Sequence, residues 1–179
     1  MGMMEMLLWV WNNVKKDIPE VEWKALEIGS YMGESTQILA SSGLFRGGIT
    51  CVDKWKGDPV WDEEESEMDW GIVRDQFNIN TRFFLDSFCP ITQIRGESSA
   101  TVSAFKDDSV DFIYIDGDHS YSQVKRDLRD YFPKIKKGGI IAGHDYCEVA
   151  WPETVNAVDE VVGIPDKVFM DSSWLKVVK

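Results

Sequence analysis

The stretch Ala25-Leu26-Glu27-Ile28-Gly29-Ser30-Tyr31-Met32-Gly33-Glu34-Ser35-Thr36 decides the fold of this chain. A short apolar run reaches a turn with two glycines, and a helical pattern begins directly after it. This order predicts a strand, a tight turn and a helix, which is how an α/β nucleotide-binding unit begins. Gly29 has no Cβ, so we expect the main chain of the turn to approach a ligand there. Gly33 is expected to let the helix pack close to the strand it has just left.

The spacing of this turn distinguishes between two classes of cofactor. A dinucleotide turn reads Gly-x-Gly-x-x-Gly, and its second glycine makes room for a pyrophosphate. Tyr31 stands at that place here, and Glu27 adds a negative charge just before the turn. Both features disfavour NAD(P) and favour a ligand with positive charge, such as S-adenosylmethionine. A glycine turn without any ligand is the alternative explanation of the same residues.

The composition predicts one packed domain over residues 1–179. The chain has 179 residues, of which 44% are hydrophobic, and this length supports a sizeable core. Its formal net charge of -12 disfavours nucleic acid and anionic membranes as partners, because such a surface repels phosphate groups. Three distant cysteines without a C-x-x-C pattern predict a reducing compartment. With no signal-peptide pattern and no apolar run of membrane-spanning length, we expect a cytoplasmic protein.

Strands and helices alternate along the rest of the chain. Residues 1–17 predict an amphipathic N-terminal helix that covers a sheet edge or contacts a second copy, which leaves a homodimer open. Strands are predicted at residues 24–28, 48–53, 91–95, 110–116, 140–143, 167–169 and 174–178. Residues 55–71, which contain Asp62-Glu63-Glu64-Glu65, are predicted to form an acidic loop or lid. This pattern predicts an α/β fold: a mainly parallel seven-stranded sheet with helices on both faces and an antiparallel C-terminal strand pair.

Polar side chains follow nearly every predicted parallel strand. Ligands of such sheets bind outside the carboxyl ends of the strands, so we expect these side chains to share one rim. They are Glu27, Asp53, Glu97, Asp116, His144 and Asp145. Asp53 lies 20 residues beyond Gly33, near the distance at which an α/β unit places an acid on a ribose hydroxyl pair. An ordinary strand-end aspartate is the alternative.

The motifs at these strand ends resemble those of class I S-adenosylmethionine-dependent methyltransferases, and more narrowly the small bacterial group related to macrocin (sugar) O-methyltransferases. The resemblance implies a single Rossmann-like domain that methylates a small hydroxylated molecule such as a sugar or natural product. A catalytically inactive nucleotide-binding module and an NAD(P)-dependent enzyme are the alternatives. The motifs are residues 27–36 and 52–58, Gly96-Glu97-Ser98, residues 112–121, Lys137-Gly138-Gly139 and Gly143-His144-Asp145-Tyr146.

The resemblance also implies roles for single residues. The turn formed by Gly29, Ser30, Tyr31 and Gly33 holds the methionine part of the cofactor, and Glu27 supports the turn or binds the amino group. Asp53 accepts both ribose hydroxyls, and Trp55 lies against the adenine. Glu97 and Ser98 lie near the adenine edge, and Asp116 lies close to the reacting methyl.

Two alternatives for catalysis stay open. Related metal-dependent O-methyltransferases carry ligands at positions that match Asp116, His144 and Asp145, so a divalent ion such as Mg²⁺ is one of them. Mg²⁺ prefers oxygen ligands, however, and His144 stands where those enzymes carry Asp. The other alternative makes His144 or His119 a general base that takes the proton of the acceptor hydroxyl. Each histidine alternatively serves only to cap a helix or to order a loop.

Overall fold

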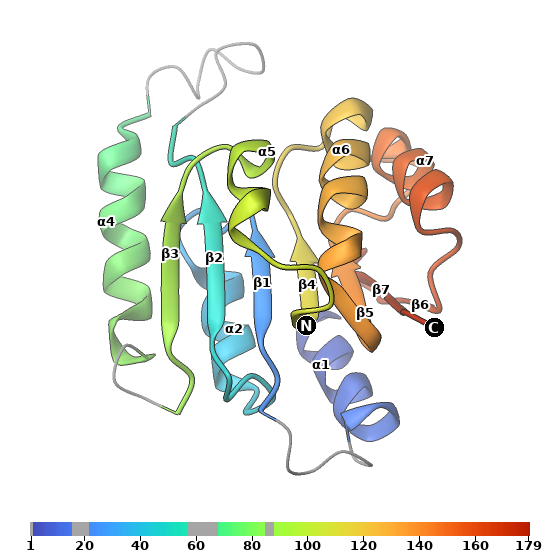
Figure 1. Cartoon of the computed structure of the whole chain (residues 1–179). Helices are drawn as coiled ribbons and strands as arrows, with labels where there is room; N and C mark the ends of the chain where they lie inside the picture. The colour runs from blue at the N-terminus through green and yellow to red at the C-terminus, as the bar shows by residue number, and fades with distance from the viewer. Residues whose placement is uncertain (1, 16–21, 57–67, 85–87) are drawn as a thin grey trace.

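The computed structural model describes residues 2–15, 22–56, 68–84 and 88–179. Within these ranges, seven strands form one sheet in the order β3-β2-β1-β4-β5-β7-β6 (Figure 1). All neighbouring strands are parallel except the two pairs that contain β7. The predicted mainly parallel sheet with an antiparallel C-terminal pair is therefore confirmed. The strands are β1 (Ala25–Ile28), β2 (Ile49–Asp53), β3 (Ile91–Arg95), β4 (Val110–Ile115), β5 (Ile135–Gly143), β6 (Lys167–Val168) and β7 (Trp174–Val177).

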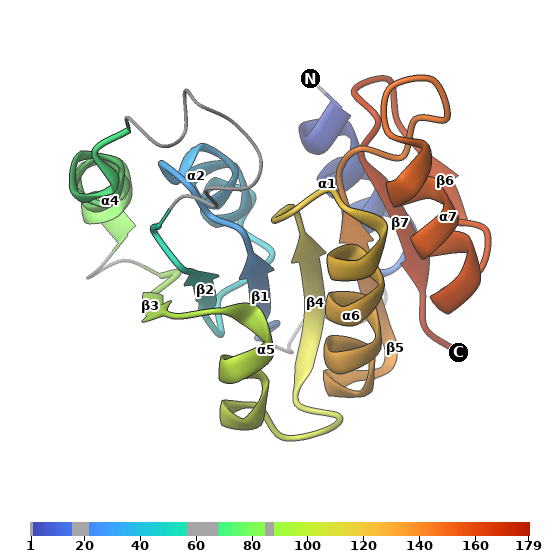
Figure 2. The ribbon, with the colours of Figure 1, turned by 90° about the horizontal axis from the view of Figure 1, so that it is seen from above.

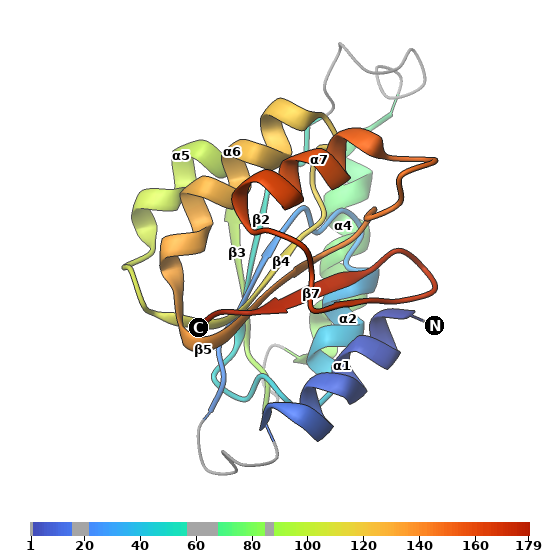
Figure 3. The ribbon, with the colours of Figure 1, turned by 90° about the vertical axis from the view of Figure 1, so that its right-hand side faces the viewer.

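Helices cover both faces of the sheet, as Figures 2 and 3 show. One face carries α1 (Gly2–Asn13), α2 (Glu34–Ser41) and α4 (Trp70–Thr81), and the other carries α5 (Ser98–Thr101), α6 (Tyr121–Tyr131) and α7 (Pro152–Val161). Each face has its own hydrophobic cluster. Every residue of β1 and β4 is buried, as expected for central parallel strands covered on both sides.

The register of the central strands brings the predicted rim together. Ile28 of β1 pairs with Val52 on one side and with Ile115 on the other, and Ile115 pairs with Gly143 of β5. The residues after these positions therefore leave the sheet at one level. The chain order reverses at β1, which has β2 and β4 as neighbours, and a crevice is expected at such a switch point.

Several predicted boundaries differ from the structure. The helix α4 begins at Trp70, where the side chain of Asp69 caps it by accepting from the Gly71 amide. The predicted loop 55–71 therefore ends before Trp70, and its central part, residues 57–67, lies outside the described residues. The N-terminal helix spans Gly2–Asn13 rather than residues 1–17. None of the helices in the described ranges is long and apolar enough to cross a membrane.

Candidate active site

A cavity of about 950 Å³ opens at the carboxyl ends of the parallel strands. Its walls come from the turn after β1 and from the segments that follow β2, β3 and β4. Part of α6 and the residues before α7 complete it. The predicted site residues that line it are Gly29, Ser30, Tyr31, Asp53, Glu97, Ser98, Asp116 and His119.

The turn after β1 is held by an internal carboxylate. Asp53 Oδ2 accepts the backbone amides of Ser30 at 2.9 Å and Tyr31 at 2.8 Å. Its other oxygen, Oδ1, accepts the amide of Trp55 at 2.6 Å. A carboxylate offers about four lone-pair sites, and three are filled here. Oδ1 of Asp53 can therefore accept one ribose hydroxyl. To accept both hydroxyls, as predicted, Asp53 would have to give up one of its hydrogen bonds to the loop.

Unusual backbone angles mark this rim. Gly29 has a φ of +84°, and a Cβ added there would lie 2.2 Å from the carbonyl oxygen of Asp116. Tyr31, Trp55 and Asp145 are non-glycine residues with φ angles of +43°, +40° and +61°, respectively. Each of the three lies just after a parallel strand. Such strained positions gather at binding and catalytic sites, because a surrounding structure must hold them in place.

Glu27 lies behind the turn and not in the cavity. It is completely buried, and its Oε2 accepts from the Thr36 hydroxyl of α2 and from the Cys51 thiol at 3.5 Å. Burial raises the pKa of this carboxyl, although its hydrogen bonds oppose the shift. Of the two roles predicted for Glu27, its position supports the turn, and the contact with an amino group stays a prediction.

Gly33 and Trp55 are also corrected. An added Cβ on Gly33 would meet Phe77 of α4 at 3.0 Å, so the glycine is needed for packing against that helix and not against β1. The side chain of Trp55 is fully buried, because its left-handed backbone turns the ring inward. The indole lies 5.1 Å from the Phe77 ring and donates to the Tyr31 carbonyl at 2.9 Å. It stabilises the turn from below and has no exposed surface for an adenine.

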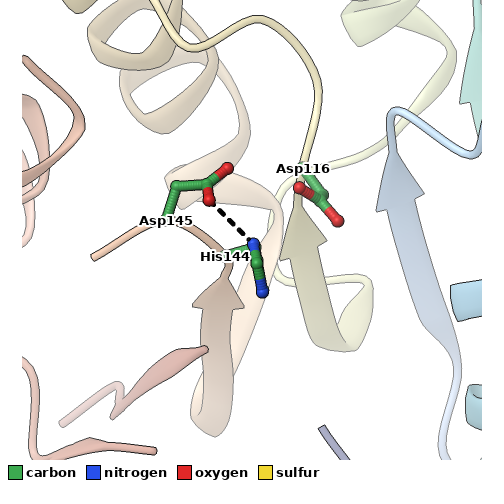
Figure 4. Close-up of side chains that lie close together, drawn as sticks. All are labelled: Asp116, His144 and Asp145. Atoms are coloured by element: carbon green, nitrogen blue, oxygen red, sulfur yellow. Dashed lines mark hydrogen bonds and ion pairs between the residues drawn. The ribbon is translucent and has the colours of Figure 1, made fainter. Parts of the chain in front are cut away.

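Two imidazoles share one carboxylate at the ends of β4 and β5. Asp145 Oδ1 lies 2.9 Å from Nδ1 of His144, and Asp145 Oδ2 lies 3.0 Å from Nδ1 of His119. Figure 4 shows Asp116 beside this group, at the end of β4. In the same view the second nitrogen of His144 points away from Asp145. His144 is half-buried behind the rim, whereas His119 lines the cavity directly.

The charges in this cluster are coupled. Hydrogen bonds to Asp145 raise the pKa of both histidines, and burial opposes this rise. Burial disfavours ionisation of Asp145, but the hydrogen bonds from His119 and His144 outweigh it and hold its pKa well below its usual range. Burial raises the pKa of Asp116 to about 6, although the nearby His144 lowers it. The cluster therefore combines an ionised Asp145 with two imidazoles whose protonated form it favours, beside the Asp116 carboxyl with its raised pKa.

The donor set does not fit Mg²⁺ in this arrangement. One ligand atom from each of Asp116, His144 and Asp145 lies within 4.8 Å of the others. Each oxygen of Asp145, however, already contacts an imidazole nitrogen, and Mg²⁺ requires near-octahedral oxygen coordination. An imidazole ligand instead suits softer ions. The divalent ion predicted at these residues stays a prediction, and we assign it no step.

Several residues of the cavity wall had no role predicted from the sequence. Trp151, 40% exposed, packs against His119 with ring centroids 4.6 Å apart, and Trp70 lies 6.3 Å from the ring of Tyr31. No spacing pattern marked either tryptophan. Gln123 and Asp127 of α6 also line the cavity. Asp127 stands within the apolar stripe of that helix, and an acid at such a position indicates a specific polar partner.

Comparison with known proteins identifies the family. Residues 26–146 match the family described as a methyltransferase domain. Because the match covers most of the sequence, the chain belongs to this methyltransferase family. The matched region runs from β1 to the segment after β5. It thus contains the glycine turn, Asp53 and the carboxylate–imidazole cluster.

Solved structures with this fold include two O-methyltransferases. The O-methyltransferase NovP superposes with a TM-score of 0.70 at 18% identity, covering 99% of this chain and 78% of NovP. CalS11, a TDP-rhamnose 3′-O-methyltransferase of calicheamicin biosynthesis, gives a TM-score of 0.62 at 16% identity, covering 97% and 79%. At these identities the likeness establishes the fold alone.

A curated relative matches a shorter part of the sequence. The protein R132 of Acanthamoeba polyphaga mimivirus, described as uncharacterized, is 39% identical over 54 residues. The matched segment is 30% of this chain and 24% of that protein. The chain thus spans about a quarter of this relative, and the match adds no information about activity.

Proposed function

We propose that this chain is an S-adenosylmethionine-dependent methyltransferase that methylates a hydroxyl group of a small molecule. The family supports methyl transfer in general, and one observation carries the choice of cofactor. The negatively charged carboxylate of Asp53 accepts hydrogen bonds from the backbone amides of Ser30 and Tyr31. These are the donors with which a glycine turn otherwise binds phosphate. A diphosphate therefore finds these two donors already bound and meets a negative charge beside them, which disfavours NAD(P).

The charge of the cavity wall supports the same choice. Acidic residues outnumber lysines among the residues that line it in the described part of the chain. The lysines are Lys54 and Lys56, and the acids include Asp53, Glu97, Asp116, Asp118 and Glu153. A negative wall attracts a ligand with positive charge. When bound, S-adenosylmethionine supplies a methyl group on a positively charged sulfur, which an acceptor oxygen attacks.

His144 is our candidate for the group that removes the acceptor proton. Its Nδ1 is hydrogen-bonded to Asp145, which fixes the tautomer that leaves a lone pair on Nε2. Nε2 of His144 would take the proton as the acceptor oxygen bonds to the methyl carbon and the carbon–sulfur bond breaks, so that the products would be a methyl ether and S-adenosylhomocysteine. Such general-base catalysis contributes about 10²–10⁴ in rate. Asp145 stabilises the protonated ring, as the acid of a catalytic triad does.

His119 is the second candidate for the base. It bonds the other oxygen of Asp145 and lines the cavity, where Trp151 packs against its ring. An exposed indole beside a base offers an apolar face on which an acceptor ring can lie. This arrangement supports a sugar or another ring-bearing natural product as the acceptor.

Isothermal titration with S-adenosylhomocysteine tests the cofactor, with NAD⁺ as the control ligand. We expect saturation by S-adenosylhomocysteine below millimolar concentration and no heat from NAD⁺. No binding of S-adenosylhomocysteine up to millimolar ligand, or tighter binding of NAD⁺, would overturn the proposal.

Transfer of labelled methyl groups to a panel of hydroxylated sugars and phenols tests catalysis and excludes an inactive module. The double variant His119→Ala/His144→Ala is expected to lose at least about a hundredfold in rate with unchanged affinity for S-adenosylhomocysteine. An unchanged rate in this variant would remove the catalytic assignment of both histidines.

A further inference from the structure

Three polar side chains form a closed hydrogen-bonded set in the wall of the cavity. Ser98 Oγ donates to Asp127 Oδ1 at 2.5 Å. Gln123 Nε2 donates both to Ser98 Oγ at 3.1 Å and to Asp127 Oδ1 at 3.0 Å. Asp127 is only 2% exposed, whereas Gln123 is partly exposed at the cavity. The set thus connects a buried carboxylate to the cavity through one amide side chain.

The chemistry of this set fixes which way the amide of Gln123 points. An ionised carboxylate only accepts hydrogen bonds, so the side chain must present its NH₂ group to Asp127 and not its carbonyl. The nitrogen Nε2 faces both Asp127 Oδ1 and Ser98 Oγ, which lie on the same side of it. The carbonyl oxygen Oε1 is consequently turned away from the carboxylate and is an acceptor that Gln123 can offer to the cavity.

The hydrogen bonds of Ser98 fix it within the set. Its hydroxyl hydrogen is donated to Asp127, and its backbone carbonyl accepts from the Tyr131 hydroxyl at 2.7 Å and from Thr101 Oγ1 at 3.0 Å. These bonds hold the start of α5 against α6. Ser98 therefore positions Gln123, and the predicted contact of Ser98 with an adenine edge stays a prediction.

The set lies where one end of an extended ligand is expected. The reacting end lies by the cluster of Asp116 and His144, and Asp53 lies where an α/β unit binds ribose. Gly96, whose amide donates to the Asp53 carbonyl at 2.9 Å, leads from Asp53 to Ser98 and to the set. The base of the nucleoside then faces the wall that holds Gln123.

We propose that Gln123 selects adenine by accepting a hydrogen bond from its exocyclic amino group at Oε1. This inference rests on the proposed function, because it concerns the same cofactor. A purine with a 6-oxo group presents an acceptor at that position, so two acceptors would face each other. A lost hydrogen bond with a mismatched acceptor weakens binding by about tenfold or more.

The test is calorimetric and needs no methyl acceptor. Wild-type protein is titrated with S-adenosylhomocysteine and with S-inosylhomocysteine, which differs in the 6-oxo group. We expect the adenosyl compound to bind at least about tenfold more tightly. In Gln123→Met, which keeps the length of the side chain without its carbonyl, this ratio is expected to fall close to one. Gln93→Met is the matched control, since Gln93 of β3 bonds Asn78 of α4, and it should keep the wild-type ratio.

The outcomes separate this inference from the proposed function. Equal affinity of the wild-type protein for the two nucleosides overturns the role of Gln123 and leaves the cofactor proposal intact. An unchanged ratio of the two affinities in Gln123→Met likewise overturns the role of Gln123 and leaves the cofactor proposal intact. If neither compound binds, the proposed function fails and this inference fails with it. The wild-type ratio decides the matter even if the variant does not fold.

Discussion

Replacing Asp53 with alanine should destabilise the turn after β1, whatever its effect on methyl transfer. The variant leaves the amides of Ser30, Tyr31 and Trp55 without the acceptors that lie 2.9, 2.8 and 2.6 Å away. Hydrogen bonds to charged groups each contribute about 1.5–3 kcal/mol when buried. These are partly exposed, and water replaces some of the loss, so we assign about 1 kcal/mol to each. The expected loss in free energy of unfolding is therefore about 3 kcal/mol.

Thermal and urea unfolding measure this loss directly. For a chain of this length, 1 kcal/mol corresponds to about 2–4 °C in Tm, so Asp53→Ala should melt about 6–12 °C lower. Asp53→Asn should fall between the two proteins, because its one carbonyl oxygen serves Ser30 and Tyr31 while its NH₂ group faces the Trp55 amide. Asp75→Ala, at an exposed site of α4, is the control and should shift Tm by no more than surface changes do. If Asp53→Ala melts within about 2 °C of wild type, the carboxylate does not hold the turn.

Three other buried or partly buried groups of the site give further predictions. Burial raises the pKa of Asp127 to about 6 from 3.8. Its contribution to the free energy of unfolding is therefore greatest below pH 3.8 and is lost as pH rises through 6. By linkage, the contribution that is lost amounts to about 3 kcal/mol. Asp127→Asn should therefore flatten the change in unfolding free energy between pH 4 and 7 relative to wild type, and parallel curves would contradict this. Trp55→Ala should lose about 3–5 kcal/mol in urea unfolding because it empties a core site. Trp55→Phe keeps a ring there but loses the bond to the Tyr31 carbonyl, so any loss of affinity for S-adenosylhomocysteine should come with a lower Tm; a loss of affinity at unchanged Tm would instead support the adenine contact. His144→Ala should reduce kcat by about 10²–10⁴ at unchanged affinity for S-adenosylhomocysteine. Addition of a chelator should leave the kcat of the wild-type protein unchanged, and inactivation by the chelator would instead support an ion at the cluster.

Features set by strand periodicity and sheet register were predictable from the sequence. The apolar run Val110–Ile115 marked a central strand, and parallel register necessarily brings the residues after β1, β2, β4 and β5 to one rim. Asp53, Asp116 and His119 accordingly reach the cavity wall. Residues just beyond a strand can be placed from the sequence because the strand itself fixes where its end lies.

Features set by backbone angles and by helix packing were not predictable. Trp55 comes just after a strand, as Asp116 and His144 do, but a φ of +40° turns it into the core, and no residue pattern announces that angle for a tryptophan. Gly33 was assigned to the wrong partner because the position of α4 depends on how it packs beside α2 on one face of the sheet. Gln123 gained a role only because Ser98 and Asp127, which are 29 residues apart along the chain, bond one another in the fold.

A carboxylate binds protein hydrogen-bond donors at both ends of the cavity. At the turn, Asp53 binds the amides of Ser30 and Tyr31 and so withholds two donors from a diphosphate. In the wall, Asp127 binds the NH₂ group of Gln123 together with Ser98 and so turns the carbonyl oxygen of Gln123 away from itself. In each case a carboxylate that binds protein groups decides which polar atoms its neighbours present. If the proposed function holds, cofactor choice depends on these two aspartates, and replacing them should alter which ligand is accepted as well as how tightly it is held.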